Sequence, residues 1–85
     1  MKVRELLSDK SKWTQGTFAR DKDGFEVNSR SRYAVCWCLM GAVNKCYEDV
    51  TEVMGKLKTE VGNFVWFNDN HEYEDVVKLV ERLDI

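Results

Sequence analysis

The sequence predicts a mainly α-helical, compact domain of about four helices with one small β-hairpin. Apolar residues recur at helical spacing in several separate segments, which is the primary sign of amphipathic helices. A single Asp-Gly pair at 23–24 lies between short runs that contain strand formers and predicts the hairpin. Three Trp, three Tyr and four Phe supply large buried areas to a chain of 85 residues, a length that predicts one domain over residues 1–85.

The segment over about residues 31–47 is predicted to be the central helix around which the others pack. At 100° per residue, Val35, Leu39 and Val43 lie on one side, and further apolar side chains fill the opposite side. A helix that is apolar on nearly every side is a buried helix. Gly41 inside it costs up to about 1 kcal/mol relative to Ala. We expect the close approach of another backbone to compensate for this cost.

Three further helices are expected on the basis of apolar stripes, over about residues 2–8, 50–61 and 72–83. Asp49 and Asp69 occupy N-cap positions of the last two, each with a Glu three residues later, which resembles a capping box. Gly62 is a natural stop for the helix that precedes it. Together with the central segment these make the four predicted helices.

The hairpin is expected over about residues 17–28, with Asp23-Gly24 as a two-residue turn in which both positions have positive φ. In that register Phe18, Phe25 and Val27 share one face of the hairpin. An isolated hairpin is only marginally stable in water. We therefore expect this face to pack on the helices.

Composition excludes several classes of function. Lys and Arg total 13 against 15 Asp and Glu, a net charge of −2, which argues against a nucleic-acid binder because such proteins usually carry a basic excess. No run of about 20 apolar residues could span a membrane. The N-terminus carries no apolar stretch typical of a signal peptide, so a cytoplasmic location is expected. There the three cysteines would be thiols.

The thiols allow two interpretations. In a helix Cys36 and Cys38 point to opposite sides and cannot share a tetrahedral metal, so neither a metal nor a cofactor is expected. The alternative is a small thiol-dependent hydrolase that uses Cys36 or Cys38 as nucleophile and His71, near Asn68 and Asp69, as base. Cys38 is predicted to lie in mid-helix, away from the N-terminal dipole that would lower its pKa. The first interpretation is therefore preferred: the cysteines are small buried hydrophobic side chains and have no catalytic role.

Aromatic residues outside the predicted helices give the clearest indication of a partner. Residues 63–67 are expected to form a short strand or an extended crossing, in which Phe64 and Trp66 point one way and Phe67 the other. Since the helices can bury only one face, the outward aromatic would anchor a partner. Asn68-Asp69 would add polar contacts or, alternatively, only form a turn and a helix cap. The predicted partner-binding residues are Phe64, Trp66, Phe67, Asn68 and Asp69.

Three segments together resemble a family of small bacterial and phage proteins of unknown function. Its members carry W-x-x-G-x-x-A-x-D-x-x-G, then W-C-x-x-G-A, then a hydrophobic-N-D step and E-[DE]-V. The matching residues here are Trp13, Gly16, Ala19, Asp21 and Gly24, then Trp37, Cys38, Gly41 and Ala42, then Asn68 and Asp69, then Glu74, Asp75 and Val76. Cys36 and Cys46 lie outside this pattern. The resemblance covers nearly the whole chain, implies no activity, and suggests a conflict between host and virus as one setting.

The sequence therefore predicts a non-enzymatic protein–protein interaction module or inhibitory module. Its partner would be another protein or a second copy of the same chain, with neither nucleic acid nor membrane involved. A thiol hydrolase is the alternative. A flat exposed apolar patch would favour binding, whereas a concave site that joins a thiol to the imidazole would favour catalysis.

Overall fold

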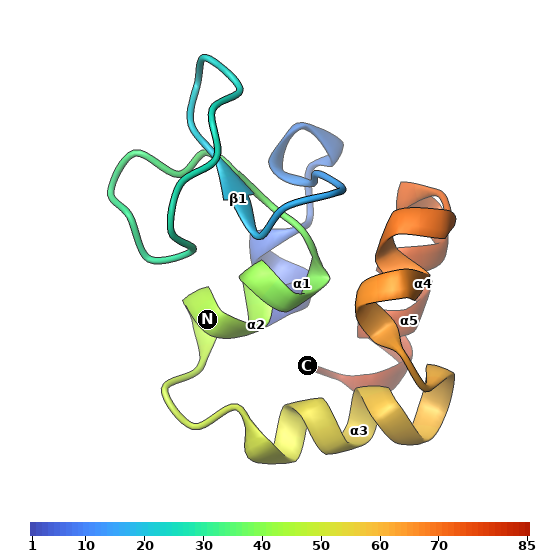
Figure 1. Ribbon diagram of the computed structural model, residues 1–85. Helices are drawn as coiled ribbons and strands as arrows, with labels where there is room; N and C mark the ends of the chain where they lie inside the picture. The colour runs from blue at the N-terminus through green and yellow to red at the C-terminus, as the bar shows by residue number, and fades with distance from the viewer.

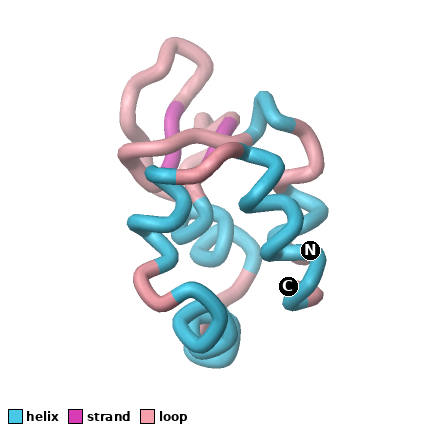
Figure 2. Tube along the Cα trace, turned by 90° about the vertical axis from the view of Figure 1, so that its right-hand side faces the viewer, coloured by secondary structure: helices cyan, strands magenta, loops and turns pink.

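The computed structural model describes all residues 1–85 and measures 34 × 26 × 20 Å along its principal axes. The helices gather at one end of the molecule, and the loops and a small sheet occupy the other end (Figures 1 and 2). In chain order the elements are α1 (Val3–Leu6), a 3₁₀ turn η1 (Lys10–Lys12), β1 (Ala19–Arg20), β2 (Cys36–Trp37), α2 (Leu39–Cys46), α3 (Thr51–Val61), α4 (Phe64–Asn70) and α5 (Tyr73–Leu83).

The prediction of a mainly helical fold with a small antiparallel sheet is confirmed. Helix α1 packs against α2 and α5, while α4 packs against α2 and α3. Fifteen buried hydrophobic residues form one core cluster between these elements. Helix α2 provides three of them, Leu39, Ala42 and Val43, all with no exposed surface. It is therefore central to the core, as the sequence predicted for this part of the chain.

The start and the length of the predicted central helix are wrong. The structure begins α2 at Leu39, and the preceding residues are extended, with β2 paired antiparallel to β1. The backbone N–H of Val35 donates to the carbonyl of Arg20 at 2.9 Å, and that of Cys38 donates to Phe18 at 3.2 Å. Aromatic and β-branched residues favour strands, and a short run that is apolar on all sides fits a buried strand as well as a buried helix.

The close backbone approach expected at Gly41 is confirmed. A Cβ at this position would lie 1.9 Å from the carbonyl oxygen of Phe18. The chain just before β1 therefore lies directly against α2, and only a residue without a side chain permits this contact. Arg30 fixes the other end of α2, because its guanidinium donates to the carbonyls of Asn44 and Tyr47, both at 2.9 Å.

The hairpin differs from the predicted one in its turn and its packing. Arg20 and Glu26 form a single antiparallel bridge, and the N–H of Asp21 donates to Phe25 O at 2.9 Å. Only Gly24 in this turn has positive φ, at 86°, so the turn is not the two-residue type expected for Asp-Gly. The Asp21 carboxylate fixes it by accepting two backbone N–H groups, and Phe25 is 69% exposed instead of packed on the helices.

The expected strand or extended crossing at residues 63–67 is wrong, because this segment belongs to α4. Gly62 ends α3 with φ 72°, and the chain then turns at once into the next helix. The side chain of Asn63 caps α4 by accepting the N–H of Trp66 at 3.0 Å. One helical turn places Phe64 and Asn68 on the same side, and both are buried. Tertiary packing and the cap thus override the strand propensity of the aromatic residues.

The final helix agrees with the sequence in its extent and its apolar face, with Val76, Leu79 and Val80 buried. Its start differs, because Glu72 is the N-cap and its N–H donates to the Asp75 carboxylate at 3.2 Å. Asp69 does not cap this helix. Asp49 does bind the N–H of Thr51 at 3.0 Å at the start of α3, but Val50 occupies the cap position.

The two chain ends lie side by side (Figure 2). The N–H of Arg4 donates to Ile85 O at 3.0 Å, and Lys2 and Arg4 both pair with the carboxylate of Asp84, at 2.7 and 3.1 Å. Ile85 is buried, so the C-terminal residue is part of the core. None of the helices is both long and apolar enough to cross a bilayer.

Candidate functional site

Helix α4 carries the residues predicted to bind a partner, and it divides them between the interior and the surface. Phe64 is 3% exposed and Asn68 is fully buried, so neither side chain is available to a partner in this conformation. Trp66 is 59% exposed, Asp69 is exposed and Phe67 is half-buried. The extended geometry that would place Phe64 and Trp66 on the same face is therefore replaced by a helix that separates them.

Asn68 links three distant parts of the chain. Its Oδ1 accepts the indole N–H of Trp13 at 2.7 Å and the backbone N–H of Leu39 at 3.0 Å. Its Nδ2 donates to Thr14 O and to Asp69 Oδ1, both at 3.1 Å. Every hydrogen-bonding position of this buried amide is thus occupied. The arrangement holds the Trp13 segment and the start of α2 against α4, which is a structural role.

Asp69 has a corresponding structural contact. Its Oδ1 accepts the backbone N–H of Gly16 at 3.0 Å, which fixes the loop before β1 against α4. Gln15 reinforces the same junction, since its amide donates to the carbonyls of Asn68 and His71 at 3.0 and 3.1 Å. Neither the turn nor the cap of α5 that the sequence suggested for Asn68-Asp69 is formed; the pair instead joins α4 to the N-terminal loop.

His71 is held by aromatic residues and lies apart from the thiols. Its ring stacks on Phe67 with centroids 3.9 Å apart and planes 18° from parallel, and Trp66 meets it edge-on at 6.0 Å. Its Nδ1 lies 3.0 Å from the carbonyl oxygen of Phe67. No hydrogen bond joins the imidazole to Cys36 or Cys38. The structure therefore does not bring together the thiol and the base of the hydrolase alternative.

Cys38 is not in mid-helix as predicted, because it is the N-cap of α2 and its Sγ accepts the N–H of Gly41 at 3.3 Å. Burial raises the pKa of this thiol, more than the backbone N–H groups of Gly41 and Met40 lower it, and the charge of Asp69 raises it further. The sulfur borders a small cavity of about 80 Å³ together with Asp69 and Phe18. A protonated thiol in so small a space is a poor nucleophile.

The other thiols are also free, and burial raises the pKa of Cys46 as well. No three His, Cys, Asp or Glu side chains are grouped so that they could hold a metal ion.

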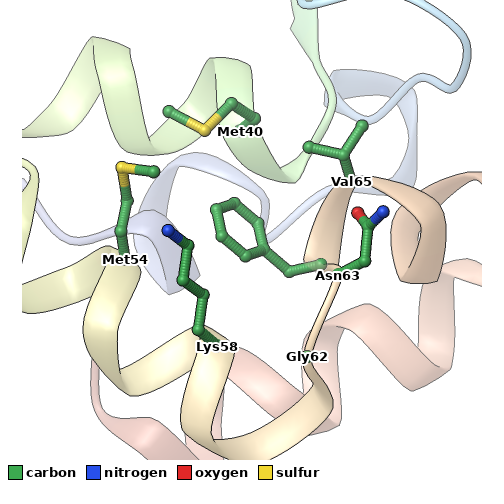
Figure 3. Close-up of a pocket in the computed structure, with 7 residues that line it drawn as sticks. Met40, Met54, Lys58, Gly62, Asn63 and Val65 are labelled. Carbon is green, nitrogen blue, oxygen red and sulfur yellow. The ribbon is translucent and has the colours of Figure 1, made fainter.

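The largest hollow on the molecule is a groove of about 500 Å³ that the sequence did not predict. It lies where α2, α3 and the start of α4 meet, and Figure 3 shows the side chains of these elements directed toward one another across it. We call it the apolar groove; its lining residues are Met40, Met54, Lys58, Gly62, Asn63, Phe64 and Val65.

The turn between α3 and α4 keeps the groove open. Gly62 has no side chain, and a Cβ built there would meet nothing within 4 Å. The amide oxygen of Asn63 is directed toward the backbone of α4 by its cap hydrogen bond. The Phe64 ring is mostly covered yet lines the groove together with Met40 and Met54. The apolar lining is thus composed of one aromatic ring and two flexible thioethers, which adapt easily to a bound side chain.

Lys58 is the only charged side chain that lines the groove. Its stem runs from α3 toward the groove, on the same side as the Met54 side chain (Figure 3). No carboxylate lies within ion-pair distance of its ammonium group; of the 13 Lys and Arg residues, only Lys2, Arg4, Lys56 and Arg82 form ion pairs. The groove therefore combines apolar walls with one unpaired positive charge.

Exposed apolar side chains continue the surface of the groove. Val65 is 39% exposed and borders both the groove and the small cavity beside Cys38 and Phe18. Phe18 is 50% exposed. Trp66 follows Val65 on the same helix and has more than half of its surface in water, but it lines neither of these two hollows. Large apolar side chains next to a hollow of this kind are typical of a protein-binding surface.

The sequence contained a partial signal for this site. Met40 and Met54 both lie in segments that the sequence predicts to be helical, but their proximity cannot be derived from periodicity alone. Val65 lies in the segment 63–67, for which the sequence predicts a strand or an extended crossing. Only the recognition that Asn63 caps a helix would have placed Phe64 and Val65 beside the methionines.

Comparison with known proteins gives a family but no activity. The model of a family described as Family of unknown function (DUF6197) matches residues 1–83. No curated protein and no solved structure matches the chain.

Proposed function

This chain belongs to the DUF6197 family of unknown function, and we propose that it is a non-enzymatic interaction module that binds another protein through the apolar groove. The partner inserts a bulky apolar side chain between Met40, Met54 and Phe64. Val65 and Trp66 contact the partner around the opening. The observation that carries the proposal is the groove itself, which holds about 500 Å³ between three helices.

The groove has the features of a hot-spot pocket. Its walls are apolar and rigidly based, because Phe64 belongs to the core cluster and α4 is anchored by the hydrogen bonds of Asn68. Most of the binding energy at protein interfaces comes from a few side chains that fill such pockets. Full burial of one Leu or Phe side chain contributes about 1.5–3 kcal/mol.

The exposed part of α4 supports the same assignment. Trp66 has more than half of its surface in water although it is large and apolar, and Val65 next to it is also exposed. Trp is enriched among the residues that dominate interface energies. The hydrolase alternative is less well supported. Burial raises the pKa of the Cys38 thiol, which keeps it protonated, and the imidazole of His71 is stacked on Phe67. Binding is thus favoured over catalysis.

We place this binding in the cytoplasm, where the three free thiols would remain reduced. A phage-encoded inhibitor that occupies a host protein is one form of such a module. A homodimer formed through the same groove is the alternative that the experiment below distinguishes from this proposal.

Site-specific photocrosslinking in cells that naturally express the protein tests the proposal. Benzoylphenylalanine replaces Val65 or Trp66 in separate variants, and Lys78 in a control variant. Lys78 is exposed on α5 and borders none of the cavities. We expect one defined protein adduct from positions 65 and 66 and none from position 78. Excess unlabelled protein abolishes the adduct, whereas excess Val65→Asp protein does not.

Mass spectrometry of the adduct identifies the partner class. A heterologous protein supports the proposal, and an adduct of two copies of this chain would replace it with self-association. Equal labelling from all three positions, or no adduct from positions 65 and 66, would overturn it.

A further inference from the structure

We infer that the partner's docking segment carries a carboxylate close to its apolar anchor, and that Lys58 binds this carboxylate. The inference rests on the proposed function, since it specifies the chemistry of the segment that the apolar groove accepts. It follows from the charges of α3 and from the position of Lys58 in the groove.

Helix α3 has four charged side chains, and three of them are already paired. Glu52 lies 3.9 Å from Lys56 on the same helix, and Glu60 lies 2.9 Å from Arg82 of α5. Lys58 alone remains without an ion pair. Because both acidic residues of α3 are engaged elsewhere, the groove side of this helix carries an uncompensated positive charge. A partner with a negative charge at this point would complete the electrostatics of the surface.

Other charges near the groove do not cancel that of Lys58. Helix α4 has one charged residue, Asp69, which borders the separate small cavity beyond Val65 and accepts hydrogen bonds from Gly16 and Asn68. Helix α2 has one, Lys45, which is exposed and does not line the groove. Neither residue supplies a carboxylate to Lys58.

The position of Lys58 links the apolar contact in the groove to the proposed ion pair with the partner's carboxylate. Lys58 lines the groove, and Figure 3 shows its side chain running from α3 toward the other lining residues, while the residue as a whole is exposed to water. Long cationic side chains often cover apolar surface in this way while the charge stays in water. When a partner side chain fills the groove, it excludes water around the ammonium group. An ion pair formed there is less screened than one on an open surface.

Selection from a random 12-residue peptide library displayed on phage tests the inference. The baits are the wild-type protein, Lys58→Glu and the matched control Lys56→Glu. Lys56 is on the same helix but does not line the groove. We expect wild-type protein to enrich peptides with a large apolar residue and an Asp or Glu within four positions. Their affinity should fall about tenfold for Lys58→Glu and less than about twofold for Lys56→Glu.

A second bait, Val65→Asp, separates the failure of the inference from that of the proposed function. Val65 is partly exposed, so this variant should retain the helical circular dichroism of the wild type. Peptides that need Val65 but lack acidic residues, or that bind Lys58→Glu as tightly as wild type, would overturn the inference and leave the groove as the binding site. Enriched peptides that are indifferent to Val65→Asp, or no enrichment at all, would overturn both.

Discussion

The indole Nε1 of Trp13 and the amide Oδ1 of Asn68 lie 2.7 Å apart, although 55 residues separate them in the chain. This bond joins the N-terminal loop to α4, and Leu39 at the start of α2 donates to the same oxygen. The position of α4 depends on these contacts, and α4 supplies one wall of the apolar groove. The site and the core are therefore linked through one buried amide.

Substitution of Asn68 by Ala should lower the free energy of unfolding by about 3 kcal/mol, because it leaves the Trp13 indole N–H and the Leu39 N–H buried without an acceptor. Urea denaturation followed by tryptophan fluorescence measures this change. Asn70→Ala is the matched control on the same helix. Asn70 is exposed and makes one hydrogen bond, to Trp66 O, so its loss should cost no more than about 0.5 kcal/mol. Equal effects of the two substitutions would contradict the role assigned to Asn68.

The two helical glycines should respond in opposite ways to substitution by Ala. At Gly41 the added Cβ would meet the Phe18 carbonyl at 1.9 Å, so α2 must move away from the β1 loop, at a cost of about 3 kcal/mol or more. At Gly55 in α3 nothing lies within 4 Å, so Ala should stabilise the protein by about 0.5–1 kcal/mol through its helix propensity. Thermal unfolding of both variants measures the difference. A Gly41→Ala protein as stable as wild type would show that the two backbones do not touch.

The sequence predicted the existence of the amphipathic helices better than their boundaries. Helix α5 follows the apolar stripe predicted over about residues 72–83, and this extent is confirmed. The sequence predicts helix for the extended residues before α2. Around Cys36 and Trp37 the run is apolar on all sides, and such a run is equally compatible with a buried strand and a buried helix. Their conformation is set by pairing with β1, a contact that is distant in sequence. The conformation of such a segment is decided by its partners.

Alkylation should distinguish the cysteines. Cys38 is 3% exposed and burial raises the pKa of its thiol, so at pH 8 it remains protonated and shielded. In the native protein iodoacetamide should modify it at least about a hundredfold more slowly than in urea, because the reaction requires opening of the structure. Cys36 is only half-buried and should react first. Peptide mass spectrometry gives both rates, and fast selective labelling of native Cys38 would restore the hydrolase alternative.

The ion pairs of Asp84 should make part of the stability depend on pH. A hydrogen bond from Lys2 and the charges of Lys2 and Arg4 lower the pKa of the exposed Asp84 carboxyl. Because the pKa is lower in the folded state, the stabilisation is present above the ordinary Asp value of about 3.9 and is lost as the pH falls below it. Asn is a suitable replacement for Asp84, because it tolerates the left-handed backbone at this position, where φ is 54°.

Asp84→Asn should therefore be less stable than wild type at pH 7, and the difference should be smaller at pH 3. Urea denaturation at both pH values provides the comparison. Added salt should also reduce the difference at pH 7, because the pair is exposed. A difference that grows as the pH falls would have the wrong sign for this ion pair.

The candidate site could be predicted only in part. Five residues of the segment 64–69 are predicted to contact a partner; of these, Trp66 and Asp69 are exposed and Phe67 is half-buried. Phe64 and Asn68 are buried instead, because a helical turn of about 100° per residue replaces the alternation of a strand. The groove depends on the meeting of Met40, Met54 and Val65 from three helices. Such a convergence follows from tertiary packing, which local periodicity does not encode.

Methionine methyl NMR tests the central claim most directly. The chain has three Met residues; Met40 and Met54 line the apolar groove, whereas Met1 is 75% exposed and lies outside it. The protein is labelled at the methionine methyl groups and titrated with the tightest peptide selected from the phage library. We predict that the Met40 and Met54 resonances shift with the same dissociation constant while Met1 remains unchanged. A peptide that binds but leaves Met40 and Met54 unmoved would contradict the assignment of the apolar groove as the binding site.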